Sequence, residues 1–308
     1  MSPEKRPVDQ AALADVVNVA SVPQRSLFRY PGGKTWLVPR ARLWLKAQPT
    51  PPRILVEPFA GGGIIGLTAM FEGLADHVVF VELDPVVAAV WRVLESGEGP
   101  DLARLITDFS CTRERVIELR ESAVRTDLDQ AFQTIVKNRT TRGGILADGV
   151  GLMKDGENGK GIASRWYPET LCRRIMDIHG IRTRMSVLSE DGLAVMERHA
   201  EEEDTVFFVD PPYTAGGKNA GNRLYGANDL DHGRLFDICA GASGDFLMTY
   251  DNSADVLRLA QSRGLTTRPI SMKSTHHAAM TELLIGRDFS WLPPSLAKIA
   301  PDITDDAA

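Results

Sequence analysis

A carboxylate, a rigid corner and an aromatic ring follow one another in the C-terminal half of the chain: Asp210, Pro211, Pro212 and Tyr213. The residues before them, 206–209, are all apolar, which is typical of a strand covered on both faces in a parallel sheet. Proline cannot donate to a sheet and restricts the residue before it, so the strand must end at the corner. Ligands of parallel sheets bind beyond the carboxyl ends of the strands, where Asp210 and Tyr213 are expected. The alternative is an Asp-Pro turn with a tyrosine that only packs.

A second candidate site is a glycine-rich turn between a strand and a helix, formed by Gly61, Gly62 and Gly63. Backbone without Cβ atoms allows a ligand to approach closely. Glu82 ends the next strand, nineteen residues after Gly63, and an acidic side chain there can hydrogen-bond both hydroxyls of a ribose. The two features indicate a cofactor that contains a nucleoside. Otherwise they are a tight turn and a surface glutamate.

The residue types around this turn also bear on the kind of cofactor. Glu57 ends the strand before the glycines, and its carboxylate would repel a pyrophosphate. S-adenosylmethionine carries a sulfonium and an amino group but no phosphate, so it fits better than a dinucleotide. Gly61, Gly63 and Gly66 can still be aligned to the dinucleotide-binding pattern, which keeps a dinucleotide-dependent oxidoreductase open.

The elements that must position these residues alternate between strand and helix, which predicts a parallel α/β sheet with helices on both faces. Between 101 and 184 the alternation gives way to charged helical sequence and a glycine-rich irregular stretch, which predicts an inserted unit. We therefore expect a flexible arm at 1–24, a catalytic domain at 25–100 and 185–295, an inserted domain at 101–184 and an acidic tail at 296–308.

Composition is that of a globular protein: 308 residues, 43% hydrophobic and 25% charged. No apolar stretch approaches the roughly 20 residues that cross a bilayer, and the first residues lack the apolar core of a signal peptide, so a cytoplasmic location is expected. Cys111, Cys172 and Cys239 are widely spaced and odd in number, which favours reduced thiols. His276 and His277 have no carboxylates at useful spacing, and no metal site is expected.

Charge is distributed unevenly along the chain. The net charge is −6, yet residues 137–184 contain ten Lys/Arg and five Asp/Glu, a local charge of +5. A basic segment in an acidic protein is expected where one face meets a phosphate backbone, although helical faces often carry surplus arginine. Arginine reads guanine or grips phosphate, and the sequence does not say which. The candidates for contacts to DNA are Arg139, Arg142, Arg165, Lys218 and Arg223.

The chain contains four segments in the order FRYPGGK, VEPFAGGG, FVELDP and FVDPPY. With these segments it resembles the Dam-like, class alpha adenine-specific DNA methyltransferases, and the resemblance extends from about residue 27 to 287. The resemblance implies a Rossmann-like methyltransferase sheet with helices on both faces, and a target-recognition role for the inserted domain. It implies methyl transfer from S-adenosylmethionine to the amino group of a flipped adenine in double-stranded DNA. It leaves open a cognate restriction or defence partner.

The same resemblance assigns residues to the cofactor. Tyr30 and Lys34 would line the cofactor and target pocket, although many relatives have tryptophan where this chain has Tyr30. The segment from Phe59 to Gly63 would surround the methionine moiety, and Glu82 would contact the ribose. Asp191 would lie near the adenine ring of the cofactor, unless it only caps the helix that follows it.

This chemistry accounts for the corner. The amino nitrogen of adenine is a poor nucleophile because its lone pair is delocalised into the ring. The Asp210 carboxylate and the Pro211 carbonyl can accept its two hydrogens and localise the lone pair, while Tyr213 stacks on the extruded base. No metal or strong general base is required. Alternatives are the cytosine amino group, whose usual motif begins with serine, an RNA adenine, a protein amide, or a DNA-binding protein without catalysis.

Overall fold

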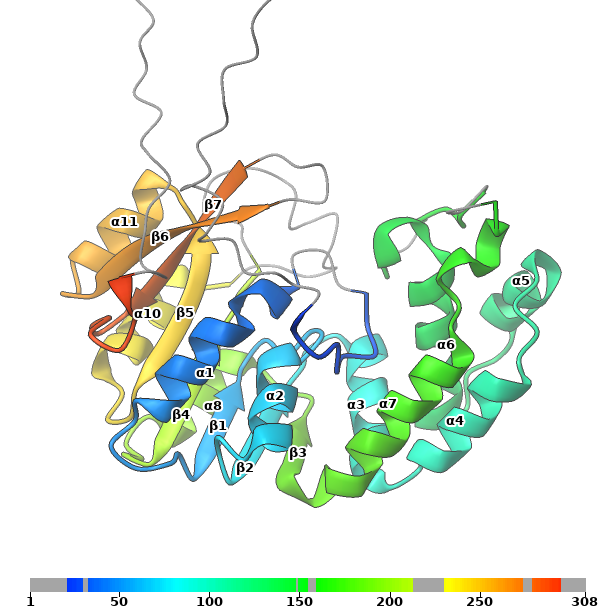
Figure 1. Ribbon diagram of the computed structural model, residues 1–308, viewed down its shortest axis with the longest axis horizontal. Helices are drawn as coiled ribbons and strands as arrows, with labels where there is room; N and C mark the ends of the chain where they lie inside the picture. Colours follow the sequence, from blue (N-terminus) through cyan, green and yellow to red (C-terminus); the bar gives the residue numbers. More distant parts are fainter. Residues whose placement is uncertain are drawn as a thin grey trace, which may run out of the picture.

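The computed structural model describes residues 21–29, 33–147, 149–154, 159–212, 230–273 and 279–294. Its centre is a seven-stranded sheet in the order β3-β2-β1-β4-β5-β7-β6 (Figure 1). Strands β3, β2, β1, β4 and β5 are parallel, and β7 runs antiparallel to both of its neighbours. The strands are β1 Ile54–Glu57, β2 His77–Val81, β3 Met185–Leu188, β4 Thr205–Val209, β5 Phe246–Asp251, β6 Thr266–Lys273 and β7 Ala279–Gly286.

Helices cover both faces of this sheet, because successive strand side chains point to opposite faces and both sets are apolar. Phe208 belongs to the core under α1, α2 and α3, whereas its neighbour Phe207 belongs to the core under α8, α10 and α11. The helices on the two faces are η3 Lys34–Leu37, α1 Val38–Lys46, α2 Ile64–Glu72, α3 Pro85–Ser96, α8 Gly192–His199, α10 His232–Gly241 and α11 Ala254–Gln261.

The strand order reverses between β1 and β4, since β2 and β3 lie on one side of β1 and β4 and β5 on the other. In doubly wound sheets this switch point opens the crevice at the carboxyl ends of the strands in which ligands bind. The predicted Rossmann-like sheet with helices on both faces is confirmed.

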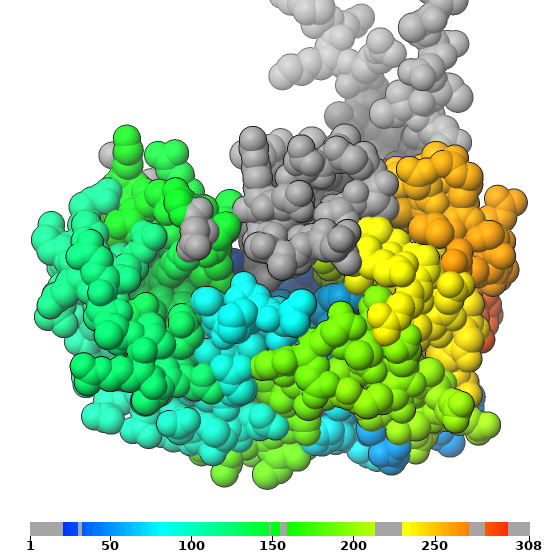
Figure 2. Space-filling view, turned by 180° about the vertical axis from the view of Figure 1, so that it is seen from behind, coloured from blue at the N-terminus to red at the C-terminus, as the bar shows by residue number. Residues whose placement is uncertain are grey.

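The elements described between α3 and β3 are helices, and they lie at the β3 end of the sheet (Figure 1). Seen from behind, their green surface and the yellow and orange surface of α10 and α11 form opposite ends of the molecule (Figure 2). The domain boundaries given above stay a prediction. The elements of this region are α4 Gly99–Asp108, α5 Arg113–Glu121, α6 Asp127–Thr140, η4 Arg142–Gly144, η5 Gly161–Arg165, α7 Pro168–Ile181 and η6 Arg182–Arg184.

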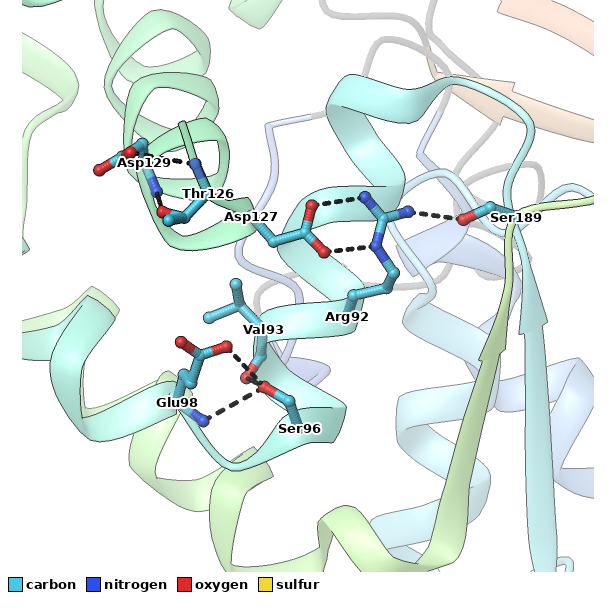
Figure 3. A network of polar contacts seen from close by, with 8 residues as sticks. All are labelled: Arg92, Val93, Ser96, Glu98, Thr126, Asp127, Asp129 and Ser189. Carbon is cyan, nitrogen blue, oxygen red and sulfur yellow. Dashed lines mark hydrogen bonds and ion pairs between the residues drawn. The ribbon is translucent and has the colours of Figure 1, made fainter. Parts of the chain in front are cut away.

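A polar network joins this helical region to the sheet (Figure 3). Arg92 on α3 donates to both carboxylate oxygens of Asp127 on α6, at 2.6 and 2.7 Å, and to the hydroxyl of Ser189 after β3 at 2.6 Å. The first turn of α6 is closed by a capping box between Thr126 and Asp129. The start of α6 is therefore fixed relative to the loop that follows β3.

Two absences apply to the described ranges only. None of their helices has the length and apolar character to span a membrane. They contain no group of three or more His, Cys, Asp or Glu residues that could hold a metal ion. His276 and His277 lie outside the described residues.

Candidate active site

The corner and the glycine-rich turn lie at the same edge of the sheet. Strands β1 and β4 are parallel neighbours, with Val56 opposite Phe207. Glu57 is the last residue of β1, and Asp210 directly follows β4. The charge of Asp210 contributes to the pKa of Glu57, so the two carboxylates are near enough to interact. The structure thus brings together two of the predicted site residues that lie more than a hundred positions apart in the sequence.

The glycines of the turn let the backbone bend sharply and also let it pack closely against neighbouring side chains. Gly63 has a φ of 58°, and a Cβ atom there would meet the ring of Trp91 at 2.7 Å. A Cβ atom at Gly66 would meet the ring of Phe80 at 2.6 Å. Gly61 also has a positive φ, of 46°, and its carbonyl accepts a hydrogen bond from the Trp91 indole at 3.1 Å. The turn is therefore pressed against two stacked aromatic rings, which fix its shape.

Glu57 is a buried carboxylate with one unused oxygen. Its side chain is 2% exposed, and Oε1 accepts a hydrogen bond from the backbone N–H of Gly66 at 2.7 Å. Oε2 has no hydrogen-bond partner among the described residues. Burial raises the pKa of Glu57 to about 8; the Gly66 N–H opposes this shift, and the charge of Asp210 adds to it. A cation next to Oε2 would compensate the buried charge.

Glu82 holds two turns together. One carboxylate oxygen accepts from the N–H of Gly61 at 2.9 Å, and the other accepts from the N–H of Asp84 at 3.0 Å. Burial raises the pKa of Glu82 to about 7, although these backbone hydrogen bonds oppose the shift. Glu82 therefore braces the turns after β1 and β2, and its contact with a ribose stays a prediction.

Asp210 is part of a charged cluster. Its Oδ1 lies 2.9 Å from the ammonium of Lys34 and accepts a hydrogen bond from the Thr249 hydroxyl at 2.8 Å. Lys34 is 4% exposed and also lies 3.6 Å from a carboxylate oxygen of Glu282. Burial alone would lower the pKa of Lys34, but the two carboxylates outweigh it and the pKa is raised. Lys34 therefore stays charged and holds Asp210 at the sheet edge.

Two members of this cluster were not predicted from the sequence. Thr249 lies in β5 and Glu282 in β7, and both side chains are buried. The signal for each is a polar residue inside an apolar strand, in FLMTYD and MTELLIG. Buried polar groups need partners, so such residues mark positions where a strand contributes to a polar site.

Other predicted cofactor residues lie around the same turn. Asp191 is exposed and accepts a hydrogen bond from the N–H of Ala194 at 2.9 Å, so it caps α8. The next residue, Gly192, lies so close to the turn after β1 that a Cβ atom would meet the Pro58 carbonyl at 2.3 Å. Phe59 is half-buried against the core under α8. The roles of Asp191 and Phe59 toward a cofactor stay predictions, and Tyr30 lies outside the described residues.

The rest of the corner and the predicted DNA contacts are only partly described. Pro211 is buried and Pro212 half-buried, whereas Tyr213, Lys218 and Arg223 lie outside the described residues. The three arginines of the basic segment that were predicted to contact DNA differ in exposure. Arg142 is exposed, Arg165 is half-buried, and Arg139 is 7% exposed. Arg139, one of the predicted DNA contacts, thus lies inside the protein.

No protein-family model matches this chain, and no curated protein matches it. A SAM-dependent methyltransferase from Agrobacterium tumefaciens has 10% identity and a TM-score of 0.38, over 82% of this chain and 61% of its own. Spermidine synthase from Thermotoga maritima has 11% identity and a TM-score of 0.37, over 82% and 57%. An rRNA methyltransferase from Streptomyces viridochromogenes has 14% identity and a TM-score of 0.36, over 92% and 94%. At these values the similarities identify neither a reaction nor a substrate.

Proposed function

We propose that this protein transfers a methyl group from S-adenosylmethionine to the exocyclic amino group of an adenine flipped out of double-stranded DNA. The observation that carries the proposal is the unused, buried Oε2 of Glu57, at the switch point and within electrostatic reach of Asp210. The residues present fit the cofactor, because its amino group supplies the cation that Glu57 lacks. A pyrophosphate at the same place brings no cation to Glu57, and its negative charge would oppose ionisation of that carboxyl.

The residues of the edge have separate tasks. Glu57 binds the amino group of the cofactor, and Glu82 orients the ribose while it braces the glycine-rich turn. S-adenosylmethionine, when bound, supplies the electrophilic methyl group on its sulfonium. Asp210 accepts one hydrogen of the target amino group, and the Pro211 carbonyl accepts the other, which raises the nucleophilicity of the nitrogen. Lys34 and Thr249 fix the direction of the Asp210 carboxylate.

The proton balance of the reaction also involves Asp210. As the nitrogen forms its bond to the methyl carbon, the carbon–sulfur bond breaks and its electron pair stays on sulfur. The nitrogen then carries an excess proton, and Asp210, already hydrogen-bonded to it, is placed to receive that proton and pass it to water. A strong base is unnecessary because the methylated amino group is acidic at this stage.

The choice of DNA and of adenine rests on the order of the four sequence segments, on the aspartate that begins the corner and on the basic segment 137–184. A direct test is expression in a bacterium without DNA methylation, followed by sequencing that reports modified bases. N6-methyladenine at one sequence is expected, and absence of any modified base would argue against DNA as the substrate. Methyl transfer to purified RNA in the same preparation would redirect the proposal to RNA.

Two further measurements separate the reaction from its rivals. Equilibrium binding of radiolabelled S-adenosylmethionine against NAD distinguishes a methyltransferase from an oxidoreductase, and tight binding of NAD would overturn the proposal. Asp210→Ala should abolish methyl transfer but keep cofactor binding. Asp177→Ala, at an exposed position on α7, is the matched control and should retain full activity.

A further inference from the structure

The loop after β3, residues 189–191, lies at the rim of the proposed cofactor site. Because β3 is the parallel neighbour of β2, the loop starts beside Glu82, which follows β2. The N–H of Glu82 donates to the Leu188 carbonyl at 2.9 Å, which joins the two strand ends. At its other end the loop enters α8, whose first residue, Gly192, is pressed against Pro58 in the turn after β1. The loop therefore borders both turns that carry the predicted cofactor contacts.

All three residues of this loop are exposed, so polar contacts rather than packing must hold it in place. A segment with little buried apolar surface opens easily unless hydrogen bonds restrain it. Glu190 and Asp191 are hydrogen-bonded to α8, the helix that the loop itself enters. Ser189 instead accepts a hydrogen bond from Nη1 of Arg92 on α3, at 2.6 Å. The contact with Arg92 therefore ties the loop to a different part of the protein.

Arg92 is itself held by a fixed support (Figure 3). Its Nε and Nη2 donate to the two carboxylate oxygens of Asp127, at 2.6 and 2.7 Å, which leaves Nη1 for Ser189. A bidentate pair sets the direction of a guanidinium as well as its distance. Asp127 is the first residue of α6, and this helix is anchored in the core through Ile135 and Val136. Arg92 thus connects Ser189 to a helix that cannot follow the movements of the loop.

Helix α3 holds both sides of the cofactor site through two consecutive residues. Trp91 and Arg92 point about 100° apart around the helix axis. Trp91 is 1% exposed, stacks on Phe80 and donates to the Gly61 carbonyl at 3.1 Å. Arg92 points outward and reaches the loop after β3. One rigid helix therefore fixes the glycine-rich turn through Trp91 and the opposite loop through Arg92.

We propose that Arg92 is a positioning residue for S-adenosylmethionine, which holds the loop 189–191 in the place that the nucleoside end of the cofactor requires. The inference rests on the proposed function and deepens it, because it names a residue that acts on the cofactor through the loop. A binding site is precise when a surrounding layer of contacts locks the groups that touch the ligand. Arg92 and Asp127 are 33% and 44% exposed, and ion pairs with such exposure add little to global stability. Loss of Arg92 should therefore change cofactor affinity more than it changes unfolding.

The test is isothermal titration of S-adenosylmethionine into the wild type, Arg92→Gln, Ser189→Ala and the double variant. Arg92→Gln should raise the Kd about fivefold, the effect of one lost net hydrogen bond. Ser189→Ala should have a similar effect, and the double variant should bind no more weakly than Arg92→Gln, because both changes remove the same contact. In methyl-transfer assays, Arg92→Gln should raise the KM for the cofactor and leave kcat unchanged. An unchanged Kd in Arg92→Gln would overturn the inference.

Arg53→Gln is the matched control. Arg53 makes an equivalent bidentate pair with Asp204, but at the amino ends of β1 and β4, away from the cofactor site. Both variants lose one partly exposed ion pair, so their melting temperatures should fall by a similar small amount. Arg53→Gln should keep the wild-type Kd. A Kd that weakens equally in Arg53→Gln and Arg92→Gln would indicate a purely structural role and overturn the inference.

Amide hydrogen exchange measures the loop directly and needs no cofactor. The N–H of Ala194 donates to Asp191, so its exchange should be faster in Arg92→Gln than in the wild type or in Arg53→Gln. Equal exchange in all three proteins would contradict the inference. If the wild type methylates DNA while Arg92→Gln keeps its cofactor affinity, this inference alone fails. If Arg92→Gln binds the cofactor more weakly but the wild type methylates no DNA, the proposed function alone fails.

Discussion

Binding of S-adenosylmethionine should release a proton from Glu57. The carboxyl is buried and hydrogen-bonded through one oxygen only, and its pKa is raised to about 8. At pH 6.5 it is therefore about 97% protonated before the cofactor binds. An amino cation placed at Oε2 favours the ionised form and lowers this pKa, so the proton leaves as the cofactor enters.

The magnitude follows from the two pKa values involved. An ordinary α-amino group has a pKa of about 7.7 to 8.0, so at pH 6.5 the cofactor arrives almost fully protonated and takes up less than about 0.1 proton. Glu57 should then contribute a net release of about 0.9 proton for each cofactor bound. Glu82, with a pKa of about 7, adds a further part that depends on how the ribose contacts it.

The assay is isothermal titration calorimetry at pH 6.5 in buffers of different ionisation enthalpy, with the wild type and Glu57→Gln. Glutamine keeps an oxygen for the Gly66 N–H but has no proton to lose, so the difference between the two proteins isolates the Glu57 contribution. Glu57→Gln should also bind the cofactor at least tenfold more weakly, the loss expected for about 1.4 kcal/mol of charge-assisted hydrogen bonding. Equal proton release by the two proteins would refute the assignment of the amino group to Glu57.

Three further predictions concern stability and positioning. Because the pKa of Glu57 is raised, the folded state binds more protons than the unfolded state between about pH 4.5 and pH 8, so stability falls as pH rises. In denaturant titrations from pH 5 to 8, the free energy of unfolding of the wild type should fall by up to about 3 kcal/mol more than that of Glu57→Gln. Thr249→Val removes the hydroxyl that donates to Asp210 and should lower kcat about tenfold in methyl-transfer assays, with little change in the KM for S-adenosylmethionine. Gly192→Ala forces a Cβ atom against the Pro58 carbonyl and should weaken both cofactor binding and folding by about 1 to 3 kcal/mol. Gly180→Ala, in α7, places its Cβ atom in open space, so it should leave cofactor binding unchanged and stabilise folding by up to about 1 kcal/mol.

The sheet could be predicted because its determinants are local. Apolar runs such as 206–209 are bounded by glycine, proline or acidic residues, and their alternation with helical sequence leaves a parallel sheet as the main solution. A parallel sheet puts the ends of β1 and β4 at one edge, so Glu57 and Asp210 could be placed near each other without coordinates. That the two strands are direct neighbours comes from the structure.

The rest depends on contacts between distant segments. Glu282 reaches Lys34 because β7 is inserted antiparallel beside β5, with Glu282 opposite Asp251, and no local pattern fixes that register. Arg139 is a candidate DNA contact from the sequence, yet its side chain lies inside the protein. It is buried because the N-terminal segment crosses α6 and accepts its hydrogen bond at Leu27, a contact between residues more than a hundred positions apart.

The two carboxylates of the site differ because, among the described residues, only Asp210 has a counter-ion. Asp210 lies against the buried ammonium of Lys34, which holds the proposed acceptor of the target amino group in place. Glu57 has only a backbone N–H and keeps its proton near neutral pH. Environments that separate two titratable groups in this way assign them different roles. If the cofactor brings the missing cation, its binding ionises Glu57 and offsets the extra negative charge beside Asp210, so we expect the site to be ready for the base only when the cofactor site is filled.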